Sequence, residues 1–356
     1  MIRTLQLQNF RGIEFVKFDD LALVNIIVGG NNTGKTSILE ALMMLYGNQQ
    51  QLKELPQTFR QSPNKDKDEW TNFWQRLVRE KNYEGFSIRS DTTAICGKKD
   101  TLNDSDSDAP NTRGFASFYR WPVKDEQLHI FDDSFDETLS NYRPLIQIKD
   151  SLNGEISDYD SVSKLKLAIL STIQPDPKYT SELFNQIAPL NPDNETKLEA
   201  LLREAIEPRL KRLRYAKLEG TTEHLVYVDL GSGPMIPFTQ MGQAFARALH
   251  IYCEIFANQP DILLIDEIEN GLYYEGLEDF WKGLFTVLKD QNVQLFATTH
   301  SRECMEAASK ADIANGMESM LRFLRLDSHI DLGKIIGTSF DSNIMTHAIE
   351  FGQEMR

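Results

Sequence analysis

Residues 29–36, GGNNTGKT, have the types and spacing of a loop that holds phosphate groups. Glycines at its first and sixth positions let successive backbone N–H groups point toward one anion, at the N-terminus of a following helix. In such a loop Lys35 would reach the β- and γ-phosphates of a nucleotide, and Thr36 would hold Mg²⁺. The sequence therefore predicts an ATP–Mg²⁺ site whose phosphate-binding residues are Gly29, Asn31, Asn32, Thr33, Gly34, Lys35, Thr36 and Ser37.

Two acidic residues, Asp266 and Glu267, follow the apolar run ILLI. A buried strand that ends in such a pair delivers both carboxylates to the edge of an open α/β sheet at which ligands bind. Asp266 would hold the metal through a water molecule. Glu267 would polarise the water that attacks the γ-phosphate, because hydrolysis needs a positioned proton acceptor more than covalent help. Two acids at a strand end can also cap a helix, but their place downstream of a phosphate loop favours the catalytic role.

A third apolar run, LFATTHS, ends in Thr299, His300 and Ser301. A lone histidine at a strand end is usually a surface group. Here it is the third strand-end polar group expected at one site. We therefore predict that His300 senses the γ-phosphate.

Composition and charge limit the classes of function. The 356 residues carry a formal net charge of −15, which opposes strong nonspecific binding to nucleic-acid backbones, so any such surface must be a local patch. No stretch approaches the roughly 18 continuous apolar residues of a spanning helix. The three cysteines have neither metal-site nor disulfide spacing. We expect a cytoplasmic protein without a membrane segment.

The elements that must position these residues follow an α/β pattern. Residues 2–10 and 14–20 alternate like two strands of an antiparallel hairpin with RGI as its turn, and the apolar residues 21–28 read as a strand buried on both faces. In the last third, strands 224–230, 261–267 and 293–300 alternate with helices 240–257 and 276–290. This alternation predicts a mostly parallel sheet flanked by helices.

The middle of the chain has a weaker pattern. Strands are expected at 86–95, 115–121, 127–131 and 144–150, with a solvated loop at 101–114, and helices at 161–173 and 195–218, the second interrupted at Pro208. We predict an N-terminal part of an ATPase head at 1–48, an inserted β and short helical lobe at 49–217, and the C-terminal part of the head at 218–356.

Six segments together resemble the ABC-type ATPase heads of the RecF, SMC and OLD-like group, and more closely its AAA15-type ATPases. They are LQLQNFRGI, GGNNTGKTSILEAL, PFTQMGQAFARAL, ILLIDEIENGLYY, QLFATTHS and AIEFGQEMR. The resemblance implies an ABC-ATPase head in which the phosphate loop of one subunit faces the signature loop of a second. ATP would then join two heads into a homodimer or higher homo-oligomer, and hydrolysis would part them.

The same resemblance implies roles for residues outside the three motifs. PFTQMGQAFARAL would be the signature segment, with Thr239 capping a helix and Gly242 beside the partner's γ-phosphate. Thr239 stands where serine is common and Ala244 where glycine is frequent, so we expect slow hydrolysis. Arg11 matches an arginine near the nucleotide, with an exposed salt bridge as the alternative. Glu269 and Asn270 would contact the second subunit, and the glutamine loop has no clear place in the sequence.

The densest basic run holds Arg209, Lys211, Arg212, Arg214 and Lys217. One interpretation is a solvated helix face that balances neighbouring glutamates. The other is a patch for nucleic acid or an acidic partner.

Two functions remain open from the sequence, and a third, weaker one is a nearly inactive ATP-gated assembly protein, which the altered signature segment suggests. We find no nuclease motif and expect no appended nuclease domain, so the ATPase would act on something that another chain supplies. The family resemblance implies that it is a sensor or scaffold that controls this separate effector, a nuclease or a toxin, in bacterial anti-phage defence. Acidity and the short lobe favour this function. The alternative is a RecF-like, ATP-dependent DNA-binding repair protein, which the basic run favours. Shared fold alone is weak support for a shared task.

Overall fold

The computed structural model describes residues 1–59, 77, 85–100, 115–123, 146–148, 154–156, 165–172, 176–217, 223–314, 320–329 and 334–350. The strand expected at 127–131 and the loop expected at 101–114 lie outside these ranges.

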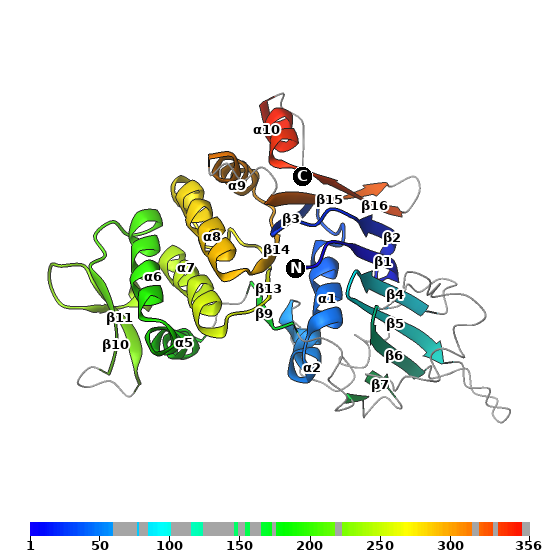
Figure 1. Cartoon of the computed structure of the whole chain (residues 1–356), viewed down its shortest axis with the longest axis horizontal. Helices are drawn as coiled ribbons and strands as arrows, with labels where there is room; N and C mark the ends of the chain where they lie inside the picture. The colour runs from blue at the N-terminus through cyan, green and yellow to red at the C-terminus, as the bar shows by residue number, and fades with distance from the viewer. Residues whose placement is uncertain are drawn as a thin grey trace.

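A sheet of seven antiparallel strands holds the N-terminus (Figure 1). Its order is β2-β1-β4-β5-β6-β7-β8, with β1 Leu5–Phe10, β2 Ile13–Phe18, β4 Gly85–Ser90, β5 Thr93–Asp100, β6 Phe115–Pro122, β7 Ile146–Ile148 and β8 Gly154–Ile156. The predicted hairpin is confirmed, since Phe10 pairs with Ile13 across a turn at Arg11 and Gly12. The single strand expected at 86–95 is instead two strands. Because β4 pairs with β1, residues on both sides of the expected boundary at 48/49 share one sheet.

The second sheet is mostly parallel, as the sequence predicted. Its order is β16-β15-β3-β14-β13-β9, and only β16 runs antiparallel to its neighbour. The bounds are β3 Val24–Gly29, β9 Leu167–Leu170, β13 Ile262–Ile265, β14 Gln294–Thr298, β15 Leu321–His329 and β16 Lys334–Phe340. Every residue of β3 and β13 is buried, because both faces of this sheet are covered.

The helix expected at 161–173 was a wrong prediction for its described part, which contains strand β9. Ala168 and Leu170 face one hydrophobic core, whereas Leu167 and Ile169 pack against the other. This alternation is the period of a strand. A short apolar run does not distinguish a buried strand from a buried helix by periodicity alone, and pairing with β13 decides here.

Helices cover the two faces of the parallel sheet separately (Figure 1). Helix α1, Lys35–Tyr46, belongs to the core shared with the antiparallel sheet, and α2, Gln49–Thr58, packs beside it. The opposite core contains side chains of α7, Gln243–Cys253, and α8, Leu277–Gln291, together with α5, Pro177–Leu190, and α6, Pro192–Ala205. Helix α9, Arg302–Ala314, packs on α8, and α10, Ser342–Glu350, packs on α9.

A third sheet lies beyond α5 and α6 (Figure 1). It contains β10 Arg212–Ala216, β11 Leu225–Asp229 and β12 Ile236–Pro237, all antiparallel. The helix expected at 195–218 therefore ends at Ala205, and its basic C-terminal part is a strand. Pro208 stops the helix, and the chain then returns along β11. The strand expected at 224–230 exists, but it belongs to this sheet rather than to the parallel one.

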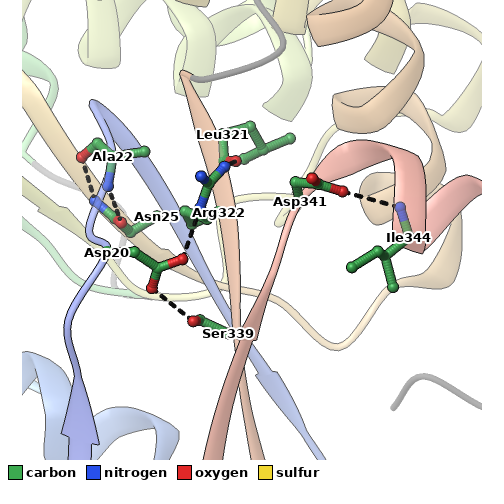
Figure 2. Close-up of polar contacts among 8 residues, drawn as sticks. All are labelled: Asp20, Ala22, Asn25, Leu321, Arg322, Ser339, Asp341 and Ile344. Atoms are coloured by element: carbon green, nitrogen blue, oxygen red, sulfur yellow. Dashed lines mark hydrogen bonds and ion pairs between the residues drawn. The ribbon is translucent and has the colours of Figure 1, made fainter.

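Polar contacts join the strands at the end of the parallel sheet opposite the phosphate loop (Figure 2). The Asp20 carboxylate, on the connection between β2 and β3, accepts from Arg322 Nε of β15 at 3.0 Å and from Ser339 Oγ of β16 at 2.6 Å. The buried Asn25 amide exchanges hydrogen bonds with both backbone groups of Ala22. These contacts fix the entry into β3 and hence the strand that carries the phosphate loop.

Candidate active site

The phosphate loop links β3 to α1, as predicted. Gly29 has φ +143°, and a Cβ atom there would lie 2.3 Å from the Leu326 carbonyl oxygen, so only glycine fits. Gly34, with φ +95°, precedes α1, whose first turn has no side-chain cap and no acidic residue. Gly30, Asn31 and Asn32 are exposed at the tip of the loop. The N-terminal N–H groups of α1 are therefore left for an anion, which fits a nucleotide phosphate.

Lys35 is held inside the loop. Its ammonium group donates to the carbonyl oxygens of Gly29 and Gly30, each at 2.7 Å. Burial lowers the pKa of Lys35, and the nearby carboxylates of Asp266, Glu267 and Glu269 oppose this shift. The phosphate loop and the acidic strand end therefore share one electrostatic environment, as expected from the positions of β3 and β13 on either side of β14.

Asp266 and Glu267 follow β13 as predicted, and Thr298 connects them. The Thr298 hydroxyl donates to Asp266 Oδ1 at 2.6 Å and accepts from the Glu267 N–H at 2.8 Å. Asp266 is 5% exposed, and burial raises the pKa of its carboxyl group. Its Oδ2 has no hydrogen-bond partner within the described ranges. A metal-bound water could use this oxygen.

Glu267 occupies a strained backbone position. Its φ of +48° lies in the left-handed region, which costs a residue other than glycine roughly 1–3 kcal/mol. Its carboxylate accepts from the Asn270 amide at 3.2 Å. Strain of this kind gathers at active sites. The local backbone therefore fits a catalytic carboxylate.

His300 follows β14 at the same sheet edge, and its side chain is exposed. Its backbone N–H donates to Glu269 Oε1 at 2.8 Å. The next residue, Ser301, accepts the N–H of Cys304 and so caps the start of α9. The structure thus places the predicted histidine beside the two acids.

These residues fit ATP and Mg²⁺. Thr36, in the first turn of α1, and Asp266 offer the hydroxyl and the carboxylate that a phosphate-loop metal site uses with the nucleotide's own oxygens. Among the described residues no group of three His, Cys, Asp or Glu side chains could hold a metal ion by itself. A site completed by phosphate oxygens agrees with this donor set.

Arg11 forms a buried ion pair with the phosphate-loop helix, and its expected place near the nucleotide stays a prediction. Its Nε lies 2.8 Å from Glu40 Oε2, and Glu40 is fully buried on α1. The pair joins the hairpin turn to the phosphate-loop helix. The alternative of an exposed salt bridge is wrong, because the Arg11 side chain is only 10% exposed.

The signature segment begins differently from the prediction. Thr239 is exposed in a 3₁₀ turn, Phe238–Gln240, and does not cap α7. Gly242, with φ +91°, precedes the helix instead, and the helix start has no side-chain cap. A threonine cap is unnecessary because the glycine turns the chain directly into α7. The N-terminal N–H groups of α7 are thereby left open.

A cavity of about 470 Å³ adjoins this helix start. Its lining includes Thr239, Gly242, Arg247, Asn270 and Gly271. It joins the signature segment to the loop that follows the acidic pair.

Sequence reasoning missed Arg247 of α7. This buried guanidinium donates to the carbonyl oxygens of Ser171 at 3.0 Å and Asp266 at 3.1 Å. It therefore ties the signature helix to the ends of β9 and β13. The spacing of Arg247 from Gly242 offered no signal for this contact, which depends on how α7 packs on the sheet.

The glutamine loop can now be sought after β9. This strand pairs with β13, and its carboxyl end points to the same sheet edge. Gln174 is the next glutamine in the sequence, and it lies outside the described ranges.

The basic run lies on an edge strand rather than on a helix. Arg212 and Arg214 of β10 are exposed and alternate with the buried Leu213. Lys211 and Lys217 are also exposed, and Arg209 pairs with Glu207 at 2.8 Å. The expected helix face is wrong, but the exposed basic patch exists.

Comparison with known proteins agrees with this geometry. Residues 24–306 match the family described as "AAA domain, putative AbiEii toxin, Type IV TA system". The chain belongs to this family. It is an ABC-type P-loop ATPase.

This ATPase is also similar to individual proteins. It is 23% identical, over 325 residues, to the "ATP/GTP phosphatase" of Helicobacter pylori, covering 86% of this chain and 87% of that protein. A shorter match of 44 residues at 52% identity links it to the DNA replication and repair protein RecF of Francisella tularensis, covering 12% of this chain and 13% of that one.

Among solved structures, an SMC head bound to the C-terminal winged-helix domain of ScpA superposes with a TM-score of 0.52. The match covers 97% of the ATPase and 99% of that chain at 11% identity, so it supports the fold alone. No helix in the described part of the ATPase is long and apolar enough to cross a membrane.

Proposed function

We propose that this ATPase dimerises on ATP and acts as a sensor or scaffold that controls a separate effector, a nuclease or a toxin, in bacterial anti-phage defence. One observation carries the dimer. The helices α1 and α7 each begin without a side-chain cap, yet they pack on opposite faces of the parallel sheet. Two uncapped helix starts suited to phosphate, on opposite sides of the fold, suit two subunits that share each nucleotide.

Each subunit would supply one half of the site. The phosphate loop would bind the nucleotide, with Lys35 on the β- and γ-phosphates. The bound Mg²⁺ would neutralise charge on the phosphate oxygens and would be held by Thr36 and, through water, Asp266. Glu267 would accept a proton from the attacking water, and His300 would contact the γ-phosphate. The exposed Thr239 and Gly242 would meet the nucleotide of the second subunit.

An exposed aromatic pair favours the same contact. Tyr273 and Tyr274 are 63% and 58% exposed, and their ring centroids lie 4.5 Å apart. They follow Asn270 and Gly271, which line the cavity beside the signature segment. Tyrosine is enriched at the energetic centres of protein interfaces. We infer that these rings are covered by the second subunit.

The proposal of a separate effector starts from the sequence, in which we find no nuclease motif. The family description names a toxin of a type IV toxin–antitoxin system, which supports a two-component module. A net charge of −15 disfavours a broad nucleic-acid surface and leaves protein partners as the better expectation.

The test is capture of the tagged Glu267→Gln protein with ATP from its native cells, followed by mass spectrometry and nucleic-acid staining. A stoichiometric nuclease or toxin in the eluate would support the proposal. The Lys35→Ala protein is the matched control, because it should not form the ATP-bound state. DNA alone in the eluate, with no protein partner, would contradict effector control.

The second candidate is a RecF-like, ATP-dependent DNA-binding repair protein. Arg212 and Arg214 favour it, because both point out from the same face of an edge strand. Charge reversal of the pair, Arg212→Glu with Arg214→Glu, should abolish DNA binding and any DNA stimulation of hydrolysis if this function holds. Lys197→Glu, on the exposed surface of α6, is the control. An ATP hydrolysis rate of the parent protein that does not change when DNA is added would exclude this candidate.

A further inference from the structure

Glu269 turns inward from a loop whose following residues are exposed. Its Oε1 accepts the backbone N–H of His300 at 2.8 Å. Its Oε2 is buried and has no hydrogen-bond partner within the part of the chain that the structure describes. The contact with a second subunit that the sequence suggested for Glu269 stays a prediction.

The hydrogen bond controls the position of His300. Strand β14 ends at Thr298, and the Thr299 N–H still donates to the Ile27 carbonyl at 3.2 Å. One residue later the N–H of His300 leaves the strand ladder and finds the Glu269 carboxylate. A hydrogen bond to a charged acceptor is roughly twice as strong as a neutral one. Glu269 thus fixes the backbone from which the imidazole projects.

The loop that carries Glu269 is tied to the catalytic acid as well. The Asn270 N–H donates to the Glu267 carbonyl at 2.9 Å, and the Leu272 N–H donates to the Glu269 carbonyl at 2.9 Å. Two consecutive turns therefore connect Glu267 to Leu272, the residue before Tyr273. A displacement of the exposed tyrosine would reach Glu267 and Glu269 through backbone hydrogen bonds.

We propose that Glu269 is a positioning residue that holds His300 for hydrolysis and links it to the loop bearing Tyr273 and Tyr274. This inference rests on the function proposed above, since it takes His300 as the γ-phosphate contact. Contact of a second subunit with the two tyrosines would then fix the positions of His300 and Glu267 at the same time. The Glu269 carboxylate would thereby make ATP hydrolysis depend on dimer formation.

A purely structural anchor explains the contacts less well. A backbone N–H can be satisfied by a neutral acceptor, whereas Glu269 brings a charge whose second oxygen is buried without a partner. Such a group destabilises the fold, so its presence calls for an explanation other than stability. Burial is the main cause that raises the pKa of the Asp266 carboxyl group, and the nearby Glu269 carboxylate adds a smaller contribution in the same direction.

The experiment compares ATP hydrolysis by Glu269→Ala, Glu269→Gln, His300→Ala and the double variant Glu269→Ala with His300→Ala. Amide hydrogen exchange over residues 298–302 is measured in the same proteins. Glu278→Ala, an exposed carboxylate on α8, is the control. We expect Glu269→Ala to lower kcat about 10- to 100-fold with little change in KM, the size of a small misplacement of a catalytic group. Glu269→Gln should keep most activity, because its amide oxygen still accepts from His300.

The double variant decides the inference. If Glu269 acts through His300, the double variant is no slower than His300→Ala, and exchange at 298–302 rises in Glu269→Ala. A loss equal to the product of the single losses, or unchanged exchange, would overturn the inference alone. An unchanged kcat in His300→Ala would overturn both this inference and the role of His300 in the proposed function.

Discussion

The hydroxyl of Thr298 donates to Asp266 Oδ1 at 2.6 Å, and the Thr298 hydroxyl oxygen accepts the backbone N–H of Glu267 at 2.8 Å. One side chain from β14 thus orients both acids that follow β13. Thr298 is 1% exposed, so water does not replace these bonds readily. The metal-binding and catalytic carboxylates are held from a neighbouring strand.

Replacing Thr298 by valine tests this arrangement. Valine keeps the shape but leaves a buried carboxylate oxygen and the Glu267 N–H without their partner, which should cost about 1–3 kcal/mol of unfolding free energy. We also expect kcat to fall by at least about 10-fold, because both acids lose their orientation. Chemical denaturation and steady-state hydrolysis measure the two effects. Thr286→Val on α8 is the control, since its hydroxyl is exposed and donates to the Lys282 carbonyl of its own helix.

Lys35→Ala should abolish ATP binding. The ammonium group is held by two loop carbonyls at the site expected for the β- and γ-phosphates. Isothermal titration calorimetry with ATP would show no detectable heat, whereas Lys282→Ala on the α8 surface should bind like the parent. Retention of parent affinity by Lys35→Ala would refute the phosphate-loop assignment.

Prediction from sequence succeeded where chemistry is local. Residue type and spacing alone predict the glycines of the phosphate loop, Lys35 and the two strand-end acids, and the strand order of the sheet brings them together. Glu269, Thr298 and Arg247 carry no such signal, because their roles arise from contacts between strands or between a helix and a strand end. The same limit explains β9, whose four apolar residues became a strand only through pairing with β13.

The basic run shows the limit of composition. Arg212 and Arg214 were expected on a helix, since glutamates, lysines and leucines favour helices around them. The structure continues after Pro208 as an edge strand instead, with Leu213 buried between the arginines. Burial of Leu213 in the core that it shares with α5 and α6 outweighs the helix propensity of the neighbouring residues.

The buried His250 predicts an acid-sensitive fold. Burial, and to a smaller degree the charge of Arg247, lowers the pKa of His250 to about 3. Glu254 and Thr180 contact the same ring, and Tyr179 packs on it. The unfolded chain binds a proton near pH 6.5, whereas the folded one does not, so stability falls as the pH drops below 6.5.

Between pH 7 and pH 5 this group should remove up to roughly 2 kcal/mol of unfolding free energy. Urea denaturation of the parent and of His250→Gln at both pH values measures the difference. The variant should lose less stability on acidification. An equal loss in both proteins would assign the acid sensitivity to other groups.

The tyrosine pair should matter for assembly and not for nucleotide binding. Tyr273→Ala with Tyr274→Ala removes two exposed rings, and we expect the ATP-dependent dimer to weaken at least about 10-fold, the scale of an interface hot spot. ATP affinity of the monomer should stay unchanged. Phe15→Ala, which removes a 50% exposed aromatic ring on β2, serves as the control. A double variant that dimerises like the parent would remove these rings from the interface.

Analytical ultracentrifugation of the Glu267→Gln protein, with and without ATP and Mg²⁺, tests most directly whether two subunits share the nucleotide. The account predicts a monomer without nucleotide and a species of twice the monomer mass with ATP, absent when Lys35→Ala is added. A monomer at saturating ATP would contradict it.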